Sequence, residues 1–138
     1  MLYLSEAAME EEIELLKATM TVAVADGQLL RSEMGVVEGL AKRIGLGSVS
    51  YEAMLEAARN DPTFADNILI QSRPKARAAV RLLVGLARID GIISDEERKV
   101  IVQIAISLGI TGDEFEQVYL AGIKHADEIR RSRRQDPG

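Results

Sequence analysis

Hydrophobic residues recur along this chain at steps of three and four positions, which is the spacing of one face of an α-helix. The pattern predicts a first helix over about 5–25 and a second that ends at Gly45. A third helix should follow with Ser50 as its cap, and a short connecting helix should run over 64–70. The first half of the chain is therefore expected to be helical throughout.

The second half continues the same pattern. Ser72, with Pro74 in the first turn, should open a helix, and Ser94-x-x-Glu97 has the spacing of a capping box. The helix over 94–108 is the most apolar in the chain, so we expect it to be central and enclosed. Its most buried side chains should be Ile101, Ile104 and Leu108.

No segment shows the alternation of period two that marks a half-buried strand. The fold class predicted is therefore all-α, with about seven helices. With 138 residues the chain suits one domain, which we place at 1–130. Residues 131–138, with three arginines and no apolar period, are expected to be a flexible basic tail.

The chain contains an internal repeat with an offset of 64 residues. Asp26-Gly27-x-Leu29-x-x-x-Glu33 returns as Asp90-Gly91-x-Ile93-x-x-x-Glu97, and the alignment continues without a gap. Over the 21 aligned positions from 26 to 46, six are identical, which exceeds the one or two expected from about average composition. The repeat predicts a duplicated helix–turn–helix unit.

The repeat also places two acidic turns in equivalent positions. If the two units pack about a pseudo-two-fold axis, four carboxylates could hold Ca²⁺, Mg²⁺ or Mn²⁺: those of Asp26, Glu33, Asp90 and Glu97. The alternative is structural, because an aspartate can accept backbone N–H groups of its own turn and a glutamate suits the positive end of a helix. Neither turn has the ligand spacing of an EF-hand.

The duplicated Asp-Gly turn, each copy followed by an apolar helix that ends in Ile44-Gly45-Leu46 or Leu108-Gly109-Ile110, resembles the TerB-like superfamily. That family includes the tellurite-resistance protein TerB and the N-terminal domain of DjlA-type membrane co-chaperones. The resemblance covers about Ile13 to Ile123. It implies an all-helical domain linked to stress and tellurite resistance, often near the inner membrane and associated with metal-responsive partners. It implies no particular reaction.

The charge and composition of the chain exclude some kinds of binding partner. The net charge is −5 and cysteine is absent, so nucleic-acid backbones and thiolate metal sites are poor candidates. No apolar run approaches the roughly 20 residues that span a bilayer. The N-terminus is acidic where a signal peptide would be basic. We expect a cytoplasmic protein, with peripheral association at the inner face of the membrane as the family resemblance implies.

Catalysis finds little support in the sequence. The single histidine, His125, is flanked by charged residues near the end of the last helix, and a solvated role is expected for it. No phosphate loop, nucleophile elbow or HExxH motif occurs. The favoured hypothesis is a non-catalytic interaction or scaffold domain with a protein partner. A divalent-cation-binding or sensing domain is the alternative, and a hydrolase is the third.

Overall fold

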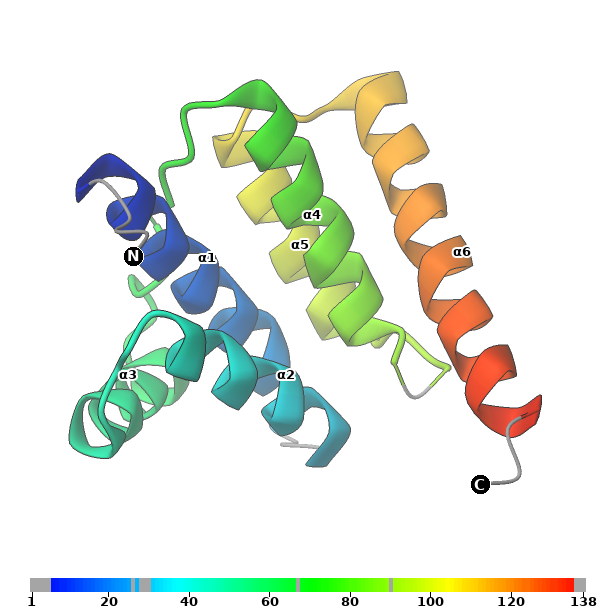
Figure 1. The fold of residues 1–138 in the computed structure, drawn as a ribbon. Helices are drawn as coiled ribbons and strands as arrows, with labels where there is room; N and C mark the ends of the chain where they lie inside the picture. Colours follow the sequence, from blue (N-terminus) through cyan, green and yellow to red (C-terminus); the bar gives the residue numbers. More distant parts are fainter. Residues whose placement is uncertain (1–5, 26, 28–30, 67, 90, 136–138) are drawn as a thin grey trace.

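The computed structural model describes residues 6–25, 27, 31–66, 68–89 and 91–135. These contain helices and turns but no strand, which confirms the all-α fold class. The helices, shown in Figure 1, are α1 (Glu6–Val24), α2 (Arg31–Arg43), α3 (Ser48–Asn60), α4 (Arg73–Ala87), α5 (Asp95–Ser107) and α6 (Gly112–Gln135). The described residues thus form six helices instead of the expected seven or so.

The missing helix is the one expected over 64–70. Asp61 ends α3, and its carboxylate Oδ1 accepts hydrogen bonds from the backbone N–H and the hydroxyl of Thr63, at 2.9 and 2.7 Å. Beyond this turn, Ile68 and Ile70 are buried whereas Leu69 is exposed. The backbone N–H of Leu69 donates to Glu14 Oε2 of α1 at 3.1 Å. The connection is therefore anchored on α1 by alternate side chains, and a helical period would turn one of these isoleucines outward.

Helix α4 is the centre of the molecule, because it packs on α6, α1, α5 and α2. Its buried residues are Ala76, Ala79, Val80, Leu83, Val84, Leu86 and Ala87. The expectation that the helix over 94–108 would be central is wrong. Helix α5 packs only on α4 and α1 among the helix pairs with substantial contact, and Ile106 on its outer face is 59% exposed. Ile101 and Ile104 are buried as predicted, but Leu108 is only partly so.

The helix ends follow the sequence signals in most places. The capping box is present: Glu97 N donates to Ser94 Oγ at 3.1 Å, and Ser94 N donates to Glu97 Oε1 at 3.0 Å. Ser72 is the N-cap residue of α4, with Pro74 in the first turn. Ser50, by contrast, is not a cap. Helix α3 begins at Ser48 with Gly47 as its N-cap residue. Helix α6 continues through residues 131–135, which were expected to belong to the basic tail.

Backbone features recur at the offset of 64 residues. Helices α2 and α5 begin and end 64 positions apart, and so do the starts of α3 and α6. The glycines of both turns and of both following helix ends have positive φ: Gly27 at 79°, Gly91 at 100°, Gly45 at 77° and Gly109 at 77°. Both helix ends close with the same bond, from Leu46 N to Ala41 O and from Ile110 N to Ala105 O. A left-handed C-cap of this kind requires a residue without Cβ strain.

Candidate functional site

Two of the four residues predicted to form a cation site, Asp26 and Asp90, lie outside the described residues. The other two, Glu33 and Glu97, are only 2% and 4% exposed in the first turns of α2 and α5. Buried carboxylates at matched positions need an explanation, since charged side chains are almost never fully buried without partners. For Glu97 the capping box supplies one, because the carboxylate accepts the backbone N–H of Ser94 at the positive end of α5.

The described residues contain no group of three or more acidic, histidine or cysteine side chains placed to hold a metal ion. Glu33 and Glu97 come from α2 and α5, which both pack on α1 and α4 and are not among the helix pairs in substantial contact with each other. The cation site therefore stays a prediction. Calorimetric titration of chelator-stripped protein with Ca²⁺, Mg²⁺ and Mn²⁺ tests this prediction. Heats equal to those of dilution into buffer would contradict the predicted cation site.

The second turn has a cationic neighbour. The guanidinium of Arg130 occupies the space that a Cβ on Gly91 would enter. Asp127 Oδ1 accepts from Arg88 Nε at 3.2 Å and from Arg130 Nη2 at 2.6 Å. The hydrogen bond from Arg88, together with both positive charges, holds the pKa of Asp127 below its ordinary value. Helix α3 ends at Asn60, so the matched helix has no counterpart of this part of α6.

An apolar groove of about 660 Å³ runs along α4, and we call it the α4 groove. Helix α4 forms its floor, with α1 and α2 on one side and the C-terminal half of α6 on the other (Figure 1). Its apolar lining consists of Leu15, Val36, Ile70, Ala78, Ala79, Leu82, Gly85, Leu86, Ile89, Ala126 and Ile129. Binding clefts for organic ligands and peptides are apolar surfaces of this kind with a few polar groups at the edge.

The charged residues of the α4 groove are mostly held in ion pairs. Glu11 on α1 lies 3.1 Å from Lys75 on α4. Glu12 on α1 lies 2.5 Å from Arg43 on α2. Arg81 forms no ion pair with any residue that the structure describes. These contacts fix the three helices around the groove and leave Arg81 available at its edge.

Gly85 lies on the floor of the α4 groove, inside a helix. A Cβ placed on it would have no atom within 4 Å. Glycine inside a helix lowers the free energy of unfolding by about 1 kcal/mol relative to alanine. No contact among the described residues requires a glycine at position 85, so its presence needs another explanation. A glycine on an open surface allows another backbone to approach closely. Gly85 could have been noticed in the sequence as an isolated glycine within a helical pattern, but its position in a groove could not.

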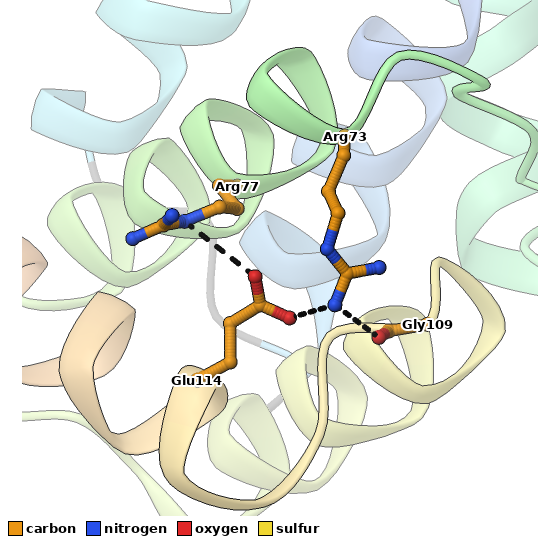
Figure 2. A network of polar contacts seen from close by, with 4 residues as sticks. All are labelled: Arg73, Arg77, Gly109 and Glu114. Atoms are coloured by element: carbon orange, nitrogen blue, oxygen red, sulfur yellow. Dashed lines mark hydrogen bonds and ion pairs between the residues drawn. The ribbon is translucent and has the colours of Figure 1, made fainter.

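A second hollow of about 440 Å³ lies between the N-terminal halves of α4 and α6. Figure 2 shows its polar network, in which Arg73 and Arg77 both face Glu114, and Arg73 also donates to Gly109 O at 3.5 Å. Glu114 lies in the first turn of α6, where the helix dipole favours an acid. The arginines are thus engaged in holding the end of α5 and the start of α6 against α4, which is a structural role.

Comparison with known proteins gives no further assignment: no family model matches the chain, and neither a curated protein nor a solved structure matches it significantly. Among the residues that the structure places, no helix combines the length and the apolar character needed to cross a bilayer.

Proposed function

We propose that this protein is a non-catalytic interaction domain that binds a protein partner in the α4 groove. The observation that carries the proposal is the groove itself, an apolar surface on the most buried helix of the molecule, with an unused arginine at its edge and a glycine on its floor. A concave surface lined by apolar side chains, with a few polar groups at its edge, is the usual form of a binding site.

The chemistry of the lining favours binding over catalysis. Most of its charged groups, Glu11, Glu12, Arg43 and Lys75, are already engaged with one another. The floor consists of aliphatic side chains, which supply contact area and no reactive group, and His125 of α6 is the imidazole of the lining. Such a surface contributes affinity through burial, at about 25 cal/mol per Å² of apolar area before the costs of association.

We further propose that the domain consists of two copies of a helix–turn–helix–helix unit of the TerB-like kind. Support comes from the matched helix bounds and the matched glycine-terminated turns at the offset of 64 residues. A role in stress or tellurite resistance is what the resemblance adds. Growth of a deletion strain on tellurite, compared with the parent strain, tests that role separately from the groove.

Affinity capture with a groove-blocking variant tests the interaction. The full-length protein, its Gly85→Leu variant and a Gly39→Leu control are immobilised and exposed to lysate of the native cells. Gly39 is a matched control because it also lies inside a helix with open space around its Cβ position, but outside the groove. We expect a protein retained by the parent and by Gly39→Leu and lost with Gly85→Leu. Identical capture by all three would refute binding in the groove.

A further inference from the structure

We propose that the occupant of the α4 groove is an amphipathic helix of a partner protein with a net negative charge. This inference rests on the proposed function and names the kind of segment that the groove recognises. Three features of the groove carry it: its length along α4, the shape of its floor and the sign of its charge.

The groove runs along the whole of α4. Its lining includes Lys75 near the start of the helix and Ile89 just beyond its end. At a rise of 1.5 Å per residue this corresponds to about 20 Å, or roughly four turns of a docked helix. A single side-chain pocket would not extend so far, and an elongated apolar groove of this length is the usual site for the apolar face of a helix.

The floor is shaped for close approach of another helix. Ala78, Leu82 and Gly85 recur at steps of four and three, so they lie on one face of α4, and Ile89 follows four residues later, just beyond the end of the helix. Small side chains at Ala78 and Gly85 leave depressions on either side of Leu82, into which side chains of a docked helix can fit. A peptide that adds as a β-strand would need a free sheet edge, and the described part of the chain has no strand. A polyproline peptide would need an aromatic-lined groove, and the described lining has no aromatic side chain.

The charge of the groove is opposite to that of the chain. Its lining has four basic side chains, Arg43, Lys75, Arg81 and Arg130, against the acids Glu11 and Glu12, so it is positive where the chain as a whole carries −5. Arg43 and Lys75 are paired with these two acids, and Arg130 is paired with Asp127 of α6, so Arg81 is the cation of the described lining that has no ion pair in the described structure. A guanidinium is suited to bidentate contact with a carboxylate, so acidic residues flanking the apolar face of a partner helix would complement this edge.

Site-specific photocrosslinking identifies the segment that docks. Full-length protein with Leu82→p-benzoyl-phenylalanine is expressed in its native cells and irradiated, and the crosslinked peptide is sequenced by mass spectrometry. The same substitution at Val49, which is 84% exposed on α3 and outside the groove, is the control. The second control combines Gly85→Leu with Leu82→p-benzoyl-phenylalanine in the same protein. We expect a segment that is specific to position 82, is lost with Gly85→Leu, has apolar residues at helical spacing and is net acidic.

The charge is then tested with a synthetic peptide of the captured segment and a second in which its acidic residues are replaced by their amides. Fluorescence anisotropy should show the amide peptide binding about tenfold more weakly to the parent protein. Arg81→Glu should weaken the acidic peptide by about tenfold and change the amide peptide by less than about twofold.

The outcomes separate the two proposals. A basic segment, a segment without helical periodicity, a second copy of this chain or a lipid adduct at position 82 would overturn the acidic-helix inference. Equal affinity of the two peptides would overturn it as well. Absence of any product at Leu82 beyond those formed at Val49 would overturn the proposed function itself.

Discussion

At the scale of single residues, Tyr51 places a polar atom in the core. Its side chain is 8% exposed in the core cluster of α1, α2 and α3, and its hydroxyl has no hydrogen-bond partner in the described structure. Burial raises the pKa of Tyr51, and the nearby charges of Glu38 and Glu52 raise it further. Phe115 stands 64 positions after Tyr51 and packs against the other core cluster with a ring that has no hydroxyl.

We expect Tyr51→Phe to leave stability unchanged or to raise it by about 1 kcal/mol, because it removes a buried polar atom that gains nothing in the fold. Since the folded-state pKa of Tyr51 lies above the ordinary value of 10.0, its contribution to stability is present below that pH and is lost as the pH rises through the folded-state pKa. The parent should therefore lose more stability than Tyr51→Phe between pH 7 and about pH 11. Urea unfolding at both pH values measures this, and a large loss of stability in the variant at pH 7 would show that the hydroxyl has a partner.

The sequence predicted residues whose role is local and missed those whose role depends on the fold. Ser94 and Glu97 are three positions apart, so their reciprocal hydrogen bonds follow from spacing alone. Arg81 and Gly85 matter only because α1, α2 and α6 come to lie around α4. The residues next to Arg81 and Gly85 in the sequence do not indicate how the helices pack around α4. The acidic turns were predicted as a site instead, because their repeat is visible in the sequence itself.

At the scale of elements, α4 and α6 are the pair of helices with the most extensive contact. Gly122 of α6 lies at this crossing. A Cβ placed on it would be 2.8 Å from Val84 Cβ and 3.0 Å from the carbonyl oxygen of Arg81. The close approach of α4 therefore explains why residue 122 is a glycine. Gly85 of α4 has no such neighbour among the described residues, because the space around its Cβ position is open.

Gly122→Ala should destabilise the protein by about 1–3 kcal/mol, because the added methyl group forces α6 away from the backbone and a buried side chain of α4. The matched control is Gly39→Ala, which has open space and should gain about 0.5–1 kcal/mol from helix propensity. Chemical denaturation of both variants measures the difference in the free energy of unfolding. If Gly122→Ala were as stable as the parent, the close crossing of α4 and α6 would be wrong.

The hydrophobic periodicity predicted which segments form helices, but it did not predict which helices pack against one another. The helix over 94–108 has apolar residues on nearly every face, and this suggested a central place; instead Ile106 remains 59% exposed. Helix α4 carries Arg73, Arg77 and Arg81 on one face and yet packs on four other helices. Apolar content thus predicted which residues can be buried, whereas the packing of distant elements decided which ones are.

At the scale of the whole molecule, the two core clusters share α1. Leu16, Met20 and Ala23 of α1 lie in one core cluster with residues of α2 and α3. Ala18 and Val22 of the same helix lie in the other cluster, with residues of α4, α5 and α6. One helix therefore has two buried faces, and each core cluster depends on it. Loss of either cluster would expose one of these faces to water.

This shared helix leads us to expect a single cooperative unfolding transition, because loss of either core cluster removes the support of α1 from the other. Ile104→Ala, at a position 2% exposed in one cluster, should cost about 2–5 kcal/mol through lost burial and the remaining cavity. Leu16→Ala, at a position 0% exposed in the other cluster, should cost a similar amount and lower the midpoint of the same transition. Calorimetry with circular dichroism at 222 nm distinguishes the possibilities. Two resolved transitions, each shifted by only one of the substitutions, would mean that the two halves fold independently and that α1 does not couple them.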